Sequence, residues 1–306
     1  MKRLVIYVIT VMLVSSCSTG VRKGPSPESG PAPLLSFVFD DGNDTDYLVA
    51  RKVFLKQGAA ASFAVVTDWI NTKNYLTVSQ LLELQNDGFE IMSHTKTHPD
   101  LKGLTEEQIA SELSASKEAL EGWGLRINNL VYPYNKNDAG VRELAGKYYR
   151  SARGGRSMLN PAALDRYELK SYPFSHNISK MKKLIESAYA EGKWLIIYLH
   201  NIDIRIRASH GNGDFQPGED LLFSPSGAAG RYTMELFSWL YFVPMSGTPR
   251  AGDIITGRTS KAACRLDEIF YNDAEELEGL IKYVHSAHPD MKIVTLDKGL
   301  DIYNVK

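Results

Sequence analysis

The chain has 306 residues, enough for one large domain or two ordinary ones, and 43% of them are hydrophobic. With 23% charged residues, this composition is that of a packed globular protein and excludes general disorder or a collagen-like repeat. The 35 basic residues nearly balance the 36 acidic ones, and the resulting net charge of -1 argues against general electrostatic binding of nucleic acid. Two cysteines, Cys17 and Cys264, exclude a disulfide framework.

The N-terminus has the pattern of a targeting segment. Lys2 and Arg3 precede an apolar run over residues 4–14, which is too short for a comfortable membrane span and is typical of a signal peptide. The run ends in V-S-S-C, which resembles a bacterial lipobox with Cys17 as the lipidated residue. An ordinary secretory signal that contains a chance cysteine is the alternative.

These features predict the domain organisation. Residues 1–16 are expected to be a lipoprotein signal peptide, and the Gly-, Ser- and Pro-rich residues 17–33 a flexible tether. The folded domain is expected over residues 34–306. Such a protein would be held by its lipid on a membrane of the bacterial cell envelope and would face the periplasm or the exterior. The sequence does not indicate an oligomeric state.

Strand and helix patterns alternate after Leu34. Short apolar runs predict strands, and helical spacing with caps predicts helices. The expected strands are 34–39, 60–66, 89–92, 130–132, 148–152, 195–199 and 292–296, and the expected helices are 46–57, 78–86, 105–121, 138–147, 178–191 and 274–285. Repeated strand–helix units imply a parallel sheet with helices outside, and about seven or eight units favour an α/β barrel over an open sheet.

Two stretches break this rhythm, near residues 204–231 and 244–272. Both are Gly-rich and loop-like, and loops of that length inside a domain tend to be functional or mobile. We therefore expect two long loop insertions in the C-terminal third. Surface decoration is the alternative.

Polar side chains follow three of the predicted strands, where a parallel barrel carries its chemistry. Asp40 and Asp41 come directly after the first strand, although an acid pair before Gly is also a common turn. His94 and His98 follow the third strand, four residues apart, and can share a metal with an aspartate. His200 ends the strand 195–199, where an imidazole can donate a proton to a leaving group.

Four motifs occur in order along the chain. They are F-V-F-D-D-G at 37–42, S-H-T-K-T-H-P-D-L at 93–101, V-Y-P-Y at 131–134 and Y-L-H at 198–200. Together they resemble the motifs of the polysaccharide deacetylases, the NodB homology domain of carbohydrate esterase family 4. The resemblance spans roughly residues 34–200. It implies a distorted (β/α) barrel of about seven parallel strands and metal-dependent removal of acetyl groups from acetylated sugars.

The resemblance also implies a divalent metal bound by Asp41, His94 and His98. Zinc is the first candidate, with cobalt, nickel or manganese as alternatives. A metal in such a site polarises the acetyl carbonyl and lowers the pKa of a water molecule.

Three further roles follow from the resemblance. Asp40 matches the general base and His200 the general acid. Tyr134 matches the position whose backbone N–H helps to hold the oxyanion.

The sequence departs from the family pattern at one important place. Many members carry an arginine, which pairs with the base, where this chain has Val131. Arg153 or Arg156, in A-R-G-G-R at 152–156, is a candidate substitute. The fourth family motif, which contains the partner of the acid, is not identifiable.

The leading hypothesis is a metal-dependent hydrolase of carbon–nitrogen bonds other than peptide bonds. It would remove acetyl groups, N-acetyl first, from a cell-envelope or extracellular polysaccharide, with an acetylated glycan and not nucleic acid as its partner. A catalytically idle glycan-binding barrel and a metal-dependent amidase acting on a non-sugar amide are the alternatives. The two insertions are expected to shape the substrate groove, where Phe215 and Phe223 would stack on sugar rings.

Overall fold

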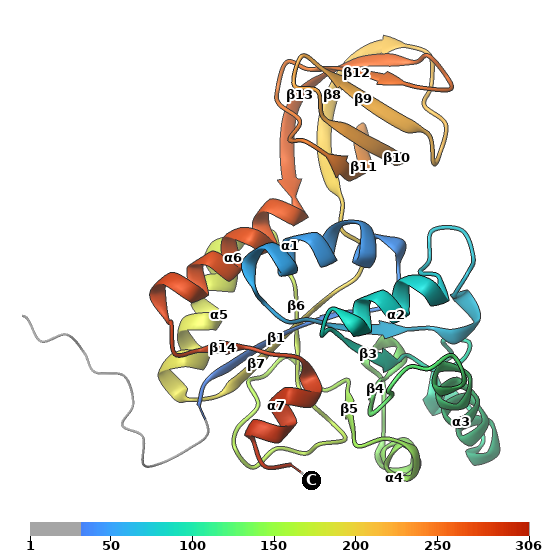
Figure 1. The fold of residues 1–306 in the computed structure, drawn as a ribbon, viewed down its shortest axis with the longest axis vertical. Helices are drawn as coiled ribbons and strands as arrows, with labels where there is room; N and C mark the ends of the chain where they lie inside the picture. Colours follow the sequence, from blue (N-terminus) through green and yellow to red (C-terminus); the bar gives the residue numbers. More distant parts are fainter. Residues whose placement is uncertain (1–31, 306) are drawn as a thin grey trace, which may run out of the picture.

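The computed structural model describes residues 32–305 (Figure 1). The predicted signal peptide, Cys17 and most of the predicted tether lie outside the described residues. Among residues 32–305, no helix is long and apolar enough to cross a membrane.

A curled parallel sheet forms the centre of the larger unit. Its strands are β1 (Leu34–Phe39), β2 (Ser62–Val65), β3 (Glu90–Ser93), β4 (Asn129–Val131), β5 (Ser151–Arg153), β6 (Tyr172–Pro173) and β7 (Trp194–Leu199). Their order is β5-β4-β3-β2-β1-β7-β6, and β14 (Lys292–Ile293) pairs in parallel with the start of β1. The seven parallel strands form an open half-barrel, which confirms the predicted distorted (β/α) barrel.

Helices cover one face of this sheet, and the C-terminal segment that contains α7 covers the other. The helices are α1 (Arg51–Gln57), α2 (Val78–Asn86), α3 (Glu106–Gly122), α4 (Ala139–Tyr148), α5 (Ile178–Glu191), α6 (Asp273–Ala287) and α7 (Leu296–Ile302), with the π-helix η1 (Asp46–Ala50) and the 3-10 turns η2 (Thr67–Trp69), η3 (Leu101–Gly103) and η4 (Pro133–Asn135). Alternate strand residues such as Phe37 and Phe39 pack on the outer helices. Leu34 and Val38 point to the opposite face, which Leu300 of α7 helps to fill. Because both faces are buried, the strands read as apolar runs without alternation.

Residues 204–272, where two loops were expected, fold instead as a second unit. The strands β8 (Ile204–Asn212), β9 (Asp220–Ser224), β10 (Ala229–Leu236), β11 (Trp239–Ser246), β12 (Ile254–Gly257) and β13 (Ala263–Asn272) form a closed antiparallel barrel in the order β10-β11-β8-β13-β12-β9. This barrel has its own hydrophobic core. In β9, for example, Leu221 and Phe223 are buried while the residues between and beside them are exposed.

The barrel also bears on the predicted roles of two aromatic residues, Phe215 and Phe223. Phe223 is only 2% exposed inside the barrel, so it cannot stack on a sugar ring. Phe215 packs against Tyr232, with 5.4 Å between the ring centroids, and lines a cavity of about 560 Å³ in the barrel. The stacking predicted for Phe223 is therefore wrong, whereas that of Phe215, which is half-buried at this cavity, stays a prediction.

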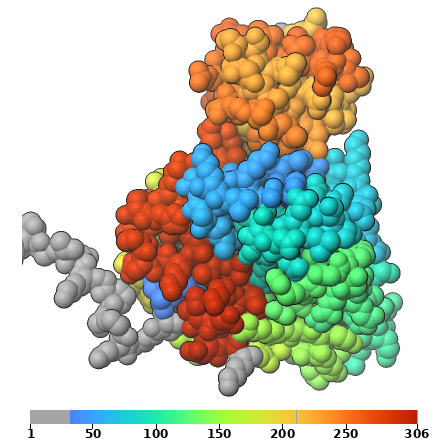
Figure 2. Space-filling model, viewed as in Figure 1, coloured from blue at the N-terminus to red at the C-terminus, as the bar shows by residue number. Residues whose placement is uncertain are grey.

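The barrel lies at one end of the molecule, above α1 and α6 (Figures 1 and 2). Four residues separate the end of β7 from the start of β8, and β13 continues directly into α6. Val243 of β11 packs into the core of the larger unit. Arg231 of β10 forms a bidentate ion pair with Asp44, with N–O distances of 2.7 and 2.8 Å. These contacts hold the barrel beside the residues that follow β1.

Candidate active site

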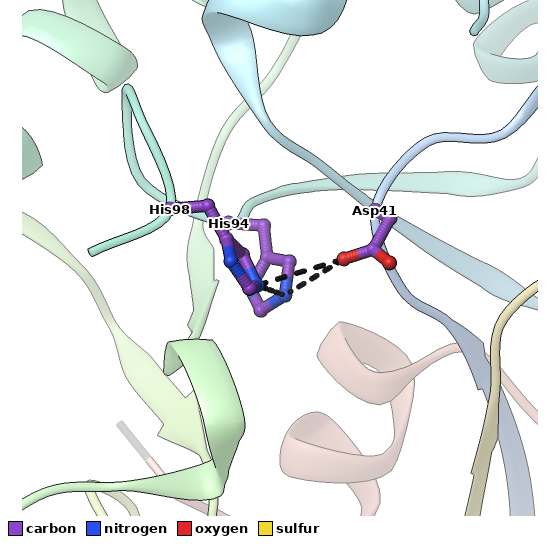
Figure 3. A group of neighbouring side chains, drawn as sticks. All are labelled: Asp41, His94 and His98. Atoms are coloured by element: carbon purple, nitrogen blue, oxygen red, sulfur yellow. Dashed lines mark hydrogen bonds and ion pairs between the residues drawn. The ribbon is translucent and has the colours of Figure 1, made fainter. Parts of the chain in front are cut away.

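The carboxyl ends of β1 and β3 bring Asp41, His94 and His98 together, as the motif spacing predicts (Figure 3). The Nε2 atoms of the two histidines are 3.2 Å apart. Oδ1 of Asp41 lies 3.5 Å from His94 Nε2 and 3.6 Å from His98 Nε2. Ligands at 2.0–2.1 Å from a tetrahedral metal are separated by roughly 3.3 Å, so these three atoms are spaced as ligands of one ion.

The polar environment of the cluster favours metal binding. Oδ1 of Asp41 is buried and has no hydrogen-bond partner among residues 32–305. Nδ1 of His94 lies 2.8 Å from the carbonyl oxygen of Val131, so this nitrogen donates its proton and leaves the Nε2 lone pair free for a metal. An unpaired buried carboxylate oxygen and an oriented imidazole are what a divalent cation requires, and the three residues fit such an ion.

Two pKa shifts act in the same direction. Burial raises the pKa of Asp41, but the neighbouring His94, His200 and His98 outweigh it and bring the pKa below its ordinary value. Burial, and then the proximity of His94, lower the pKa of His98. Both shifts favour the carboxylate and the neutral imidazole, which are the forms that bind metal.

The backbone around the cluster is unusual. Asp41, Thr95 and His98 have φ angles of 78°, 69° and 64°, in the left-handed region that non-glycine residues avoid. Gly42 has φ 76°, and a Cβ there would lie 2.9 Å from Cγ1 of Val65. Such conformations persist where the surrounding structure enforces them, most often at functional sites.

Asp40 lies beside the cluster in a separate ion pair. Nη2 of Arg153 lies 2.5 Å from Oδ2 of Asp40 and also contacts Oδ1. The Arg153 side chain is completely buried, and its Nη1 donates a hydrogen bond to Asn135. Arg156 is exposed. Of the two candidates from the sequence, Arg153 therefore supplies the counter-charge that Val131 does not.

Tyr134 and His200 complete the predicted set. Tyr134 lies in η4 with φ 58° and ψ 16°, and its ring meets that of His98 edge-on at 4.7 Å. The His200 side chain follows β7 and is exposed. Its charge contributes to the lowered pKa of Asp41, so it lies near the cluster.

Comparison with known proteins finds similarity to one family over part of the chain. The family model for polysaccharide deacetylase matches residues 28–150, which include Asp40, Asp41, His94, His98 and Tyr134. A curated relative, "Putative polysaccharide deacetylase YxkH" of Bacillus subtilis (strain 168), is 33% identical over 112 residues. Residues 28–150 therefore resemble a NodB-type polysaccharide deacetylase.

The likeness covers only part of each protein. The match to the Bacillus subtilis relative spans 35% of this chain and 40% of the relative. A gellan lyase of Bacillus sp is 32% identical over 131 residues, which are 42% of this chain and 5% of the lyase. The solved structure of the Streptococcus pyogenes deacetylase PplD in complex with acetate has 24% identity and a TM-score of 0.46, over 48% of this chain and 67% of that one.

The larger unit contains one buried acid that the sequence did not single out. Asp46, at the start of η1, is completely buried, and neither of its carboxylate oxygens has a hydrogen-bond partner among the described residues. Burial, and then the charges of Asp41, Asp40 and Asp44, raise its pKa well above the ordinary value. The raised pKa favours the protonated, neutral form of Asp46.

This protonation predicts a pH-dependent stability. Because the folded chain holds a proton that the unfolded chain releases, stability falls as pH rises from the ordinary Asp pKa toward the raised one. Asp46→Asn has no such proton, so its free energy of unfolding should not fall in this way. The difference in free energy of unfolding, variant minus parent, should therefore increase by about 1.4 kcal/mol for each pH unit in this range. Urea denaturation at pH 5, 6 and 7 measures the difference. A difference that does not change with pH would show that Asp46 is already ionised.

Proposed function

We propose that the protein is a metal-dependent hydrolase that removes acetyl groups, N-acetyl first, from a cell-envelope or extracellular polysaccharide. The observation that carries the proposal is the unpaired, buried Oδ1 of Asp41 facing two imidazole nitrogens, beside an aspartate held by Arg153. The deacetylase family of residues 28–150 supports the substrate class.

In this proposal Asp41, His94 and His98 hold the metal, with zinc as the first candidate. When bound, the metal supplies a Lewis acid that polarises the acetyl carbonyl and makes a nearby water more acidic. The cluster lies at the strand edge with Asp41 half-buried, so substrate and water can reach it.

The other residues move protons and stabilise charge. Asp40, oriented by Arg153, accepts the proton of the attacking water. The backbone N–H of Tyr134 donates to the oxyanion of the tetrahedral intermediate. His200 then protonates the departing sugar nitrogen, which is otherwise a very poor leaving group.

Acetate release from a panel of acetylated glycans, with and without chelator, tests this function. Chelator-sensitive release from a glycan is the expected result. Binding to glycans without acetate release would favour the idle glycan-binding barrel. Hydrolysis of small non-sugar amides in preference to every glycan would favour the amidase.

The antiparallel barrel provides a place for the rest of a polymer. A cavity of about 260 Å³ lies between it and the larger unit. One side of the cavity is lined by Asn43, Asp44 and Tyr75, and the other by Thr233 of β10. Asn43 and Asp44 follow Asp41 closely in the sequence, and the charge of Asp41 helps to raise the pKa of Tyr75. Polar groups and a tyrosine at an interface between units suit a sugar ring. We propose that this cavity takes the unit next to the acetylated one.

Filling the cavity tests its role. Thr233→Trp should lower kcat/KM on an acetylated pentasaccharide about tenfold, the equivalent of one or two lost hydrogen bonds of about 1 kcal/mol, and spare a small acetyl ester. Ser209→Trp is the matched control, because Ser209 lines the other cavity, within the barrel. Equal effects of both variants, or equal loss on both substrates, would reject the assignment.

We further propose that Cys17 carries a lipid that holds the protein on a membrane of the cell envelope. The V-S-S-C ending of the apolar run supports this proposal. Cys17→Ser should leave the protein unlipidated and release it from the membrane fraction, which fractionation and mass spectrometry measure. A variant processed and retained like the parent would contradict the lipobox interpretation.

A further inference from the structure

A second group of ligand-type side chains lies where the chain enters and leaves the antiparallel barrel. His176 precedes α5, and Asp273 and Glu276 lie in the first turn of α6. One ligand atom from each of the three side chains lies within 4.8 Å of the other two. Asp203, the residue directly before β8, adjoins this group through its backbone.

The carboxylates of Asp273 and Glu276 both lie close to Nδ1 of His176. Nδ1 of His176 lies 3.0 Å from Oε2 of Glu276 and 3.4 Å from Oδ1 of Asp273. In the tautomer protonated on Nε2, the Nδ1 lone pair faces both carboxylates. The plane of the His176 ring is fixed by stacking on Tyr271 of β13, at 3.6 Å and 7°. The imidazole is therefore held in one orientation by the barrel.

Asp273 has an unused oxygen that points into the group. The residue is only 5% exposed, and its Oδ1 has no hydrogen-bond partner among residues 32–305. Its other oxygen accepts a hydrogen bond from the backbone N–H of Asp203, at 3.0 Å. A buried carboxylate oxygen without a partner is costly and calls for a cation or a proton.

Acidic side chains outnumber basic ones at this junction. Oδ1 of Asp203 is also buried without a partner, and burial raises the pKa of Asp203. Burial, and then the charge of Asp203, raise the pKa of Asp273 to about 7. The basic groups that act on Asp203 are His176 itself and Arg205, whose guanidinium stacks on Trp239 at 4.4 Å. Three acidic side chains therefore lie near one imidazole, with one guanidinium near Asp203.

We propose that this junction binds a second divalent transition-metal cation through His176, Asp273 and Glu276. One imidazole with two carboxylates suits zinc or manganese. The ligands come from α6 and the loop before α5, and Asp273 also holds the backbone that enters β8. A bound cation would therefore order the segments through which the chain enters and leaves the barrel, which contact these ligands through the Asp203 N–H and the Tyr271 ring. The inference stands whether or not the proposed function is correct.

Metal stoichiometry tests the proposal. The purified full-length chain is loaded with Zn²⁺ or Mn²⁺, dialysed and analysed for metal per chain. The parent should hold two ions, Asp41→Asn one, and Asp41→Asn with His176→Gln none. His285→Gln, at an exposed histidine in the last turn of α6, is the matched control and should change nothing.

Thermal unfolding provides a second readout. Added metal should raise the Tm of Asp41→Asn by about 5 °C or more at a hundredfold excess over Kd, and this shift should vanish with His176→Gln or Glu276→Gln. One ion in the parent and none in Asp41→Asn, with no shift in Tm, would overturn the proposal. The junction would then be an imidazolium ion pair with its two acids.

Discussion

Asp40→Asn should keep most of the bound metal and lose turnover by about 10²–10⁴-fold, the usual contribution of a general base. The geometry separates this residue from the metal ligands. The carboxylate of Asp40 is paired with Arg153, whereas Oδ1 of the adjacent Asp41 faces the two histidines. Neighbours in sequence therefore have different partners, and their substitution should have different consequences.

The matched variants are Asp41→Asn, His94→Ala and His98→Ala. Each removes a proposed direct ligand, so each should lower bound metal and turnover together. Elemental analysis beside acetate release, on purified and folded protein, measures both quantities. Loss of metal in Asp40→Asn with retention in Asp41→Asn would reverse the two assignments.

Arg153→Met should have the second large effect. It leaves the buried Asp40 without its cation, which costs about 3–5 kcal/mol of stability when one partner of a buried pair is removed. Turnover should fall by about 10²-fold or more because the base is no longer held in place. Bound metal should be largely retained, since Arg153 contacts none of the three ligands.

Two variants control for the loss of a positive charge. Arg156 is exposed and lies four residues after Ala152 of β5. Arg156→Met should therefore leave stability and turnover near those of the parent. Asp40→Asn combined with Arg153→Met should be less destabilising than the sum of the single changes, because no unpaired charge remains. Denaturant unfolding and acetate release measure these effects. Equal effects of the two arginine substitutions would contradict the proposed pairing.

The parallel part of the fold was predictable because its signals are local. The apolar run of β1 and the helical spacing of α2 and α5 gave the observed bounds. β6 was missed because two residues carry no periodic pattern. α7 was missed because its first residue, Leu296, ends an apolar run that resembles a strand.

The antiparallel barrel was not predicted, although its sequence carries a signal. β9 alternates buried and exposed residues as a strand of a small barrel should, but it has only five residues. Glycines and short turns on both sides favoured a loop interpretation. Closure of the barrel depends on pairings such as that of β8 with β13, which are remote in sequence.

The candidate site shows the same division. The motif spacing was sufficient to predict the cluster of Asp41, His94 and His98. The partner of Asp40 was not decidable, because Arg153 lies 113 residues away and only the fold selects it over Arg156. Asp46 and Asp273 were missed because their character comes from burial, which no local pattern reports.

The most direct test of the central claim is the recovery of activity in metal-stripped protein. The chain is stripped with chelator, its residual metal is determined, and zinc is returned stepwise while acetate release from an acetylated glycan is followed. The expected result is no release from the stripped chain and recovery with returned zinc in the parent, but no recovery in Asp41→Asn. Full activity in a parent shown to contain no metal would contradict the mechanism altogether.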